Sequence, residues 1–413
     1  MSINAKYQID SEENKQFLSE FRENLLNFGH GFPSPGGSCY WLGDDGTPMF
    51  ERTRDTYETC RMVHVYCIGS FMGYERSLDL VNAGLKGIRG ELHDAQYGGW
   101  YSSLTQDGTP VAAKQCYTHA FVLLAATSAM LAGVSGADEL LNEAIDVYDR
   151  YFWEESAGLS LDTWNNDFTK CDPYRGLNAN MHSVEAFLAV ADVAGLEEFR
   201  VRAGRIINHV VKWASENSWR IPEHFFEDWT PNRDFNIKNP NDPFKPYGAT
   251  PGHGMEWARL IAQWALSTYK DNNAERDKYI SYSKELYMRA FQDAWYVDGE
   301  PGLIYTTDWE GKPVIHDRMH WVLCEAINTS AMLYRLSGER RYADDYEQLM
   351  KYLDEKVIDK VNGSAFHQMD RYNHVIGTVW PGKNDLYHAV QATLIPYYAP
   401  DMSIAKAVKD NNK

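Results

Sequence analysis

The sequence is short of positive charge. Its 413 residues include 40 lysines and arginines against 58 aspartates and glutamates, so the formal net charge is −18. Proteins that bind nucleic acids through the backbone do so by neutralising phosphates with lysine and arginine. A chain with this deficit is a poor partner for nucleic acid or for an anionic membrane surface. We therefore expect neither partner.

Long apolar segments and paired cysteines are also missing. The longest nearly apolar run, residues 121–134, is too short to span a bilayer, and residues 1–15 lack the apolar stretch of a secretory signal. The six cysteines are scattered without a C-x-x-C pair, in a chain too long to need disulfide bonds for stability. We therefore expect reduced, mostly buried thiols and a cytoplasmic protein.

Aromatic residues, in contrast, are abundant. They make up 14% of the chain, with 26 tyrosines and 13 tryptophans, and many fall in glycine- and aspartate-rich segments between helical patterns. Rings with polar tips suit a carbohydrate pocket, although they also build ordinary cores. The hydrophobic content of 44% with 24% charged residues is that of a globular protein.

Apolar positions at a spacing of 3.6 residues predict about twelve helices. Their ranges are 11–29, 52–73, 77–93, 115–133, 137–152, 180–194, 197–217, 254–270, 273–295, 318–337, 340–356 and 385–398. The connections alternate in length: the chain turns within a few residues after each even-numbered helix up to the tenth, whereas long insertions follow the odd-numbered helices. Three insertions, at 98–108, 158–166 and 302–311, resemble one another and each predict a short β-hairpin.

This alternation is an internal repeat of helix pairs, about 60 to 70 residues long. Six such pairs bury their apolar faces by closing into a ring with an inner and an outer layer. The sequence thus predicts an all-α fold, an (α/α)6 barrel over residues 1–413 as one catalytic domain, with short β-hairpins in the long loops on one face. That face is where a functional site is expected.

Histidines recur in register with the repeat. Five lie near the starts of even-numbered helices, separated by 63, 71, 67 and 68 residues: His119, His182, His253, His320 and His388. In a closed ring such positions lie at similar depth, and Arg61 on the second helix can join them. Each of these histidines taken alone fits a helix cap or a core residue equally well. The remaining histidines are expected to be surface or structural residues: His64, His209, His224, His316, His367 and His374.

Three chemistries fit such a cluster. Histidine and glutamate from different helices can bind zinc or iron, but the H-E-x-x-H and Glu-x-x-His patterns are missing. A glycosidase needs two carboxylates, and no pair stands out among the loop acids Asp162, Asp167, Asp228, Asp317 and Asp370. Imidazole can take and return a proton near neutral pH, which favours isomerisation or epimerisation next to a carbonyl without a cofactor or metal.

The chain resembles the N-acylglucosamine 2-epimerase family, and within it the bacterial aldose–ketose isomerases that act on mannose and related sugars. The resemblance covers nearly the whole chain. Its most specific segments are 54–66 (RDTYETCRMVHVY), 117–121 (YTHAF), 180–186 (NMHSVEA), 251–257 (PGHGMEW) and 386–388 (LYH).

The resemblance implies an (α/α)6 barrel, no cofactor and a free monosaccharide as substrate. By the same resemblance, His253 and His388 are the acid/base pair. The residues that hold and polarise the sugar are Arg61, Tyr117, Asn180, His182, Glu256 and Glu325. His119 and His320 do not stand at motif positions and are expected either to support the site residues from behind or to be structural.

The expected reaction interconverts D-mannose and D-fructose, with D-lyxose and D-xylulose as a further pair, through a cis-enediol. His253 protonates the ring oxygen, His388 removes the C2 proton, and Arg61 meets the developing oxygen charge. Return of the proton to the opposite face of C2 would make a 2-epimerase of the same residues.

Further alternatives stay open. The glycine-rich segment 248–254 lacks the lysine and spacing of a phosphate loop, so nucleotide dependence is not expected. Isomerisation of the sulfonated sugar sulfoquinovose would need loop cations such as Arg175, Arg233, Lys238 and Lys245. A sugar-binding protein without catalysis is a third reading, and a homo-oligomer is compatible with the sequence.

Overall fold

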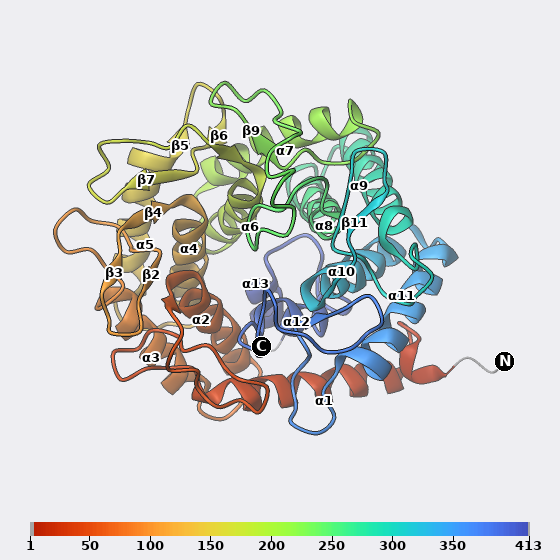
Figure 1. Ribbon diagram of the computed structural model, residues 1–413, viewed down its shortest axis with the longest axis horizontal. Helices are drawn as coiled ribbons and strands as arrows, with labels where there is room; N and C mark the ends of the chain where they lie inside the picture. Colours follow the sequence, from red (N-terminus) through yellow and green to blue (C-terminus); the bar gives the residue numbers. More distant parts are fainter. Residues whose placement is uncertain (1–3, 412–413) are drawn as a thin grey trace.

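The computed structural model describes residues 4–411, and its helices form two concentric rings (Figure 1). The inner ring consists of α2 (Thr56–Phe71), α4 (Cys116–Leu131), α6 (Leu177–Ala194), α8 (Pro251–Thr268), α10 (His320–Ser337) and α12 (Tyr387–Ala392). The outer ring consists of α1 (Glu12–Phe28), α3 (Ser77–Arg89), α5 (Ala137–Val147), α7 (Glu197–Ser215), α9 (Asn273–Ala294) and α11 (Arg340–Tyr352). Each inner helix contacts the next, and α12 contacts both α10 and α2. The ring is therefore closed, and the predicted α/α barrel is confirmed.

The two layers differ in how their side chains are buried. In α5 the buried residues form one stripe, Ala137, Leu140, Leu141, Ala144 and Val147, as expected for a helix with one face in solvent. In α4 and α8 almost every residue is buried, because these helices touch the outer layer on one side and the barrel axis on the other. Polar residues on inner helices consequently lie in the centre of the protein.

The long insertions carry the strands, which are two or three residues long. They are β1 (Arg54–Asp55), β2 (Ser103–Leu104), β3 (Pro110–Val111), β4 (Ala113–Gln115), β5 (Trp153–Glu154), β6 (Leu159–Ser160), β7 (Thr163–Asn165), β8 (Arg175–Gly176), β9 (His224–Phe225), β10 (Thr306–Thr307), β11 (Pro313–Ile315), β12 (Arg318–Met319) and β13 (Gln368–Met369). Short 3-10 or π turns, η1 (Ala5–Tyr7), η2 (Gly29–Gly31), η3 (Tyr148–Phe152) and η4 (Leu353–Val357), adjoin the outer helices α1, α5 and α11.

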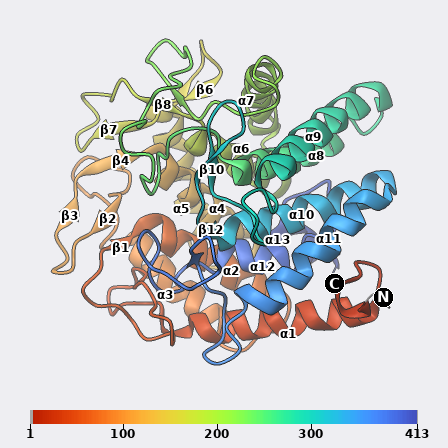
Figure 2. The ribbon, with the colours of Figure 1, turned by 45° about the vertical axis from the view of Figure 1, so that its right-hand side comes forward.

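Neighbouring insertions pair with one another. β1 pairs with β2, β4 with β7, β8 with β9, and β12 with β13, each joining one insertion to the next. A bridge between Ala249 and Thr307 links two more insertions, and the Lys383 amide donates to the Leu42 carbonyl across the last gap. A belt of backbone hydrogen bonds thus runs around one face of the barrel, at the N-terminal ends of the inner helices (Figure 2).

A tight turn recurs in all six insertions, although the sequence pattern showed only three. Each turn has a left-handed residue whose amide donates to the carbonyl three residues before it. These residues are Gly46, Gly108, Phe168, Trp229, Gly311 and Asn373. The predicted hairpin at 158–166 is wrong as a self-contained unit, because β6 pairs back with β5 whereas β7 pairs with β4 of the preceding insertion.

Several helix bounds differ from the prediction. α2 starts at Thr56 rather than at 52, and α6 and α8 each start three residues early, at Leu177 and Pro251. α12 ends at Ala392, six residues before the predicted end, where Pro396 follows and cannot continue a helix. A thirteenth helix, α13 (Ile404–Asn411), was not predicted.

The segment after α12 closes the other end of the barrel. α13 contacts α2, α4 and α6. Ser403 donates its amide to Asp192 near the C-terminal end of α6, and Lys409 donates to the Leu131 carbonyl at the end of α4. The C-terminal segment therefore lies opposite the insertions, which leaves the insertion face as the open end.

None of the helices within residues 4–411 combines the length and apolar character needed to cross a membrane. All six cysteines are unpaired, and five of them are buried. The expectation that the thiols are mostly buried is therefore confirmed.

Buried ion pairs fasten the two ends of three insertions. A basic residue just before an inner helix meets an aspartate that follows the preceding outer helix: Lys114 with Asp94, Arg318 with Asp298, and Lys383 with Asp359. Lys114 and Asp94 are 2.8 Å apart, with side chains 0% and 1% exposed. Lys114 also donates to the Gly98 carbonyl. Because both charges are out of water, each needs the other.

We expect Lys114→Ala to destabilise the protein by about 3–5 kcal/mol, because Asp94 would keep a buried charge without its partner. Urea unfolding followed by circular dichroism measures this. Lys15→Ala is the matched control, since Lys15 and Glu12 form an exposed pair on α1, and its effect should stay within about 0.5 kcal/mol. Equal effects of the two substitutions would contradict the structural role of the Lys114 pair.

Candidate active site

A cavity opens at the N-terminal ends of the inner helices, on the insertion face. It encloses about 630 Å³ of unfilled space, part of which is open to solvent. Residues from all six inner helices or the segments just before them line it: Tyr57, Glu58, Arg61, Tyr117, Asn178, His182, Pro243, Phe244, His253, Glu256, Tyr305, His320, Trp321, His367, Trp380, Asn384, Asp385 and His388. The lining combines aromatic rings with many hydrogen-bonding groups, which is the composition of a site for a small polar ligand.

Two histidines of the cavity are each backed by a carboxylate. His253 Nδ1 lies 3.0 Å from Glu223 Oε2, and His388 Nδ1 lies 2.9 Å from Glu325 Oε1. An ionised carboxylate only accepts hydrogen bonds, so each Nδ1 carries the proton. The Nε2 atom of each neutral ring is then a free proton acceptor.

The Trp321 ring contacts both of these histidines. Its ring centroid is 5.1 Å from that of His253 and 5.7 Å from that of His388. The two imidazoles therefore border the same part of the cavity from α8 and α12. A ligand in this space would meet an acid/base group on either side.

Arg61 supplies a fixed positive charge to the cavity. It donates from Nη1 to Asp385 at 2.8 Å and from Nη2 to the Tyr117 hydroxyl at 2.8 Å, while Nε has no partner. Burial by itself would raise the pKa of Asp385, but Arg61 together with His388, His320 and His367 outweighs it and holds this pKa well below its usual range.

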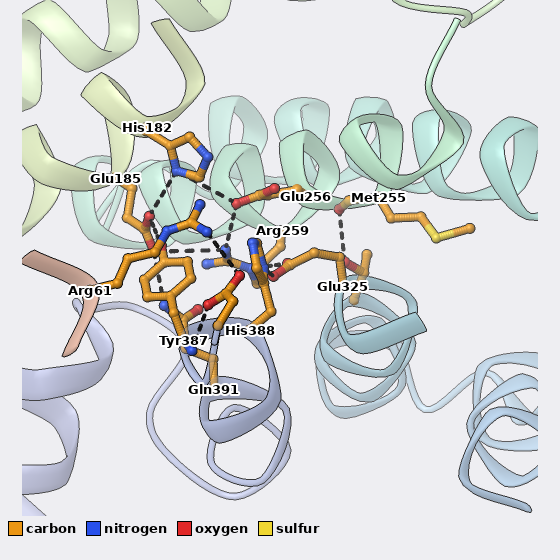
Figure 3. A network of polar contacts seen from close by, with 12 residues as sticks. Arg61, His182, Glu185, Met255, Glu256, Arg259, Glu325, Tyr387, His388 and Gln391 are labelled. Carbon is orange, nitrogen blue, oxygen red and sulfur yellow. Dashed lines mark hydrogen bonds and ion pairs between the residues drawn. The ribbon is translucent and has the colours of Figure 1, made fainter. Parts of the chain in front are cut away.

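A network of charged side chains forms the floor of the cavity (Figure 3). Five inner helices contribute to it: Arg61 from α2, His182 and Glu185 from α6, Glu256 and Arg259 from α8, Glu325 from α10, and Tyr387, His388 and Gln391 from α12. Arg259 Nε donates to Glu325 at 3.0 Å, and its Nη2 lies 3.6 Å from Glu256 and 3.9 Å from Glu185. One guanidinium thus faces three buried carboxylates.

These carboxylates titrate differently. Burial, together with the nearby Glu325 charge, raises the pKa of Glu256 well above its usual range. Burial alone would also raise the pKa of Glu325, but Arg259 and His388 lower it overall. Both Glu256 oxygens lack a hydrogen-bond partner. The raised pKa favours the protonated form of Glu256, which can both donate and accept a hydrogen bond at the cavity wall.

The structure brings six of the eight predicted site residues to the cavity wall: Arg61, Tyr117, His182, Glu256, His253 and His388. Glu325 does not line it and lies behind His388 instead. Asn180 does not line it either. Its amide bonds to Ser160 and Gly176, so it fastens an insertion rather than facing the cavity.

Asn178, two positions earlier in the same helix, does line the cavity, and its amide oxygen has no hydrogen-bond partner. Residues two positions apart on a helix differ in direction by about 200°. Asn178 and Asn180 therefore point to nearly opposite sides of α6, and only Asn178 faces the cavity. The predicted helix began at residue 180, so Asn178 lay outside it, whereas α6 begins at Leu177 and includes Asn178.

Two histidines predicted to be structural also line the cavity. His320 and His367 stack with ring centroids 3.9 Å apart, and neither nitrogen of His320 has a partner. The repeat register had pointed to His320, whereas His367 lies in an insertion without periodicity. His119, as predicted, is structural: it bonds to the Gln115 carbonyl and accepts the Trp100 amide.

The alternative chemistries find less support at this cavity. Among the described residues 4–411, none of the five loop aspartates considered for a glycosidase lines the cavity. None of the four loop cations considered for binding a sulfonate lines it either. Ligand atoms of Glu256, Glu325 and His388, and of His182, Glu185 and Glu256, lie within 4.8 Å of one another. Arg259, however, already provides the positive charge between these acids, so the donor set does not fit a metal ion.

Comparisons with known proteins agree on one family. The model of the N-acylglucosamine 2-epimerase (GlcNAc 2-epimerase) family matches residues 36–392. The D-mannose isomerase of Pseudomonas cannabina pv. alisalensis is 39% identical over 401 residues, covering 97% of this chain and 96% of the relative. The D-mannose isomerase of Thermobifida fusca is 36% identical over 397 residues, covering 95% and 97%. A crystal structure of D-mannose isomerase superimposes with a TM-score of 0.85 at 27% identity, covering 92% of this chain and 97% of that chain.

The two asparagines give a test of this placement. We expect Asn180→Ala to lower the free energy of unfolding by about 2–3 kcal/mol, because it leaves the buried Ser160 and Gly176 backbone groups without partners. Asn178→Ala removes no such bond and should change stability by less than about 0.5 kcal/mol. Urea unfolding of both variants measures the difference. A larger loss of stability in Asn178→Ala than in Asn180→Ala would contradict the structural role of Asn180.

The buried histidines predict a pH dependence of stability. Burial lowers the pKa of His64, His182 and His320 to about 4, whereas histidines of an unfolded chain titrate near ~6.5. Between these values the unfolded chain binds protons that the folded protein does not. Stability should therefore fall as the pH drops from 7 to 5, by about 1–2 kcal/mol per histidine.

Urea unfolding at pH 7, 6 and 5 measures this slope. His64→Gln should make it shallower, because one proton-binding group is lost from the unfolded chain. His374→Gln is the control, since the His374 side chain is 76% exposed and its loss should leave the slope unchanged. A stability that is flat between pH 7 and 5 would contradict the burial effect.

Proposed function

Because the chain belongs to the N-acylglucosamine 2-epimerase family, we propose that it is an aldose–ketose isomerase that interconverts D-mannose and D-fructose without a cofactor. The observation that carries this proposal is the pair of carboxylate-backed histidines that both contact Trp321 in one cavity. Aldose–ketose isomerisation moves one proton between neighbouring carbons, so the reaction needs acid/base groups and a way to stabilise negative oxygen.

The first step opens the pyranose ring. His253, holding a proton on Nε2, gives it to the ring oxygen as the bond between C1 and that oxygen breaks, while the C1 hydroxyl gives its proton to the solvent that reaches the open cavity. The product is the open-chain aldehyde. The Glu223 carboxylate accepts a hydrogen bond from Nδ1 of His253 during this transfer.

The second step moves the proton from C2 to C1. His388 Nε2 removes the C2 proton, the electron pair of that bond forms the C1–C2 double bond, and the aldehyde oxygen takes up a proton from solvent to give a cis-enediol. The O2 proton then passes to solvent as C2 becomes a carbonyl, and the proton held by His388 returns to C1. Aldehyde is reduced and C2 is oxidised within one molecule, so no external redox partner is needed.

Charge on the enediol oxygens is the costly part of this path. Arg61 lies on the cavity wall with a fixed charge, and burial raises the pKa of Glu256 beside it, which favours the protonated, hydrogen-bond-donating form of that carboxyl. Preorganised donors of this kind stabilise a developing oxyanion more than they stabilise the neutral sugar. Tyr117 and His182, which contact each other edge to face at 5.2 Å, are proposed to hold the sugar hydroxyls, together with Asn178.

The whole chain would act as one catalytic domain on a monosaccharide. We further propose a cytoplasmic location, which fits the unpaired cysteines and the role of such an enzyme in sugar metabolism.

Proton NMR with D-mannose in D2O tests the function. We expect D-fructose to accumulate, with deuterium entering C1 in part, because the proton on His388 can exchange with solvent before it returns. D-Glucose formed ahead of D-fructose would make the protein a 2-epimerase instead. No conversion of D-mannose or D-lyxose would contradict the proposal.

His388→Ala separates an enzyme from a sugar-binding protein. The variant should lose about 10²-fold or more in kcat while KM changes little, because the proton acceptor is gone but the sugar contacts remain. His374→Ala, at an exposed histidine of the last insertion, is the control and should keep full turnover. Unchanged turnover in His388→Ala would remove His388 from the mechanism.

A further inference from the structure

The two histidine–carboxylate pairs are built from different parts of the fold. Glu325 is an inner-helix residue, on α10, and lies beside His388 of α12. Glu223 lies in the insertion between α7 and α8, directly before β9, thirty residues before His253. No sequence pattern connects Glu223 with the site, and it does not line the cavity.

Glu223 is nevertheless held firmly. Its side chain is 4% exposed, and its carbonyl accepts the amide of Leu177 at the start of α6. The next residue, His224, is fastened through both ring nitrogens, to Tyr174 and to the Pro246 carbonyl. A backbone fixed on both sides gives the carboxylate a defined place behind His253.

The His253 ring is fixed from the other side as well. The residue before it, Gly252, packs so closely on the Trp321 ring that an added Cβ would lie 2.6 Å from it. The first turn of α8 therefore cannot shift toward α10. His253 sits between the Trp321 ring and the Glu223 carboxylate, with Nδ1 directed to the carboxylate.

The two carboxylates differ in their remaining contacts. Glu325 shares its charge, because Oε1 meets His388 and Oε2 accepts from Arg259. Glu223 bonds to His253 through Oε2, and its Oε1 is buried without a hydrogen-bond partner. Within residues 4–411 no ion pair of Glu223 with lysine or arginine is found. His253 is thus the one ion-pair partner of Glu223 among the described residues.

We propose that Glu223 is a positioning residue for His253, fixing the tautomer that turns Nε2 to the cavity and balancing the charge of the ring when Nε2 also holds a proton. The inference rests on the proposed function and deepens it. It assigns His253 the part of the proton donor at the ring oxygen, because its carboxylate is unshared. His388, whose carboxylate is shared with Arg259, takes the part of the base at carbon.

Three variants separate charge from position. In Glu223→Gln the amide oxygen can still accept from Nδ1, so the tautomer is kept and the charge is lost. Glu223→Ala loses both. Glu227→Gln is the matched control, because Glu227 lies in the same insertion with a side chain that is 75% exposed.

Steady-state kinetics with D-mannose is the first measurement. We expect kcat to fall by about 10²-fold or more in Glu223→Gln, with KM within about threefold, and further in Glu223→Ala. The pH profile of kcat/KM should move in Glu223→Gln, since the charge next to His253 is gone, and stay in place in Glu227→Gln. Wild-type kcat in Glu223→Gln would overturn the proposal.

Nitrogen NMR of 15N-histidine-labelled protein is the second measurement, with His253→Gln used to assign the signal. Wild type should show His253 protonated at Nδ1, and Glu223→Ala should show a mixture of tautomers. An unchanged His253 signal in Glu223→Ala would refute the positioning role. Should Glu223→Ala fail to fold, the kinetics and pH profile of Glu223→Gln decide.

The two measurements also distinguish a failure of this inference from a failure of the proposed function. If wild type does not convert D-mannose, the proposed function fails, yet the tautomer of His253 still shows whether Glu223 positions it. If wild type converts D-mannose and both Glu223 variants behave as wild type, the proposed function is supported and the positioning role of Glu223 is refuted.

Discussion

The positive charge of Arg259 in the barrel centre is the interaction on which the site depends. Three buried carboxylates, Glu185, Glu256 and Glu325, surround it, and without this guanidinium their mutual repulsion and desolvation would be severe. Because one arginine cannot neutralise three acids, the charge is distributed unequally. Glu185 and Glu325 stay ionised, whereas the pKa of Glu256 rises. The same arginine thus holds the buried acids together and leaves Glu256, the acid with the raised pKa, at the cavity wall.

The closed ring explains why the site lies where it does. Every inner helix points its N-terminus toward the insertion face, and each insertion is bonded to its neighbours there. The other end is covered by the segment that includes α13. Polar residues placed one or two turns into the inner helices therefore converge just below the open end. This geometry brings residues from five different helices into one network (Figure 3).

Much of this arrangement could be predicted from the sequence. Helical periodicity and alternating connection lengths give the barrel and its open face, and the resemblance points to His253 and His388. The resemblance pointed to Asn180, whereas Asn178, outside the quoted segment and the predicted helix, is the asparagine that lines the cavity. Glu223 and His367 lie in insertions, where neither periodicity nor spacing constrains direction. Glu325 was predicted as a sugar contact, although only the packed structure shows that His388 stands in front of it.

The recurrent turn of the six insertions has a consequence for how such repeats are compared. Glycine occupies its left-handed position in three insertions, but phenylalanine, tryptophan and asparagine occupy it in the others. The backbone shape is therefore conserved around the ring where residue identity is not. A structural alignment anchored on this position would superimpose all six units, whereas an alignment by letters would recover only half of them.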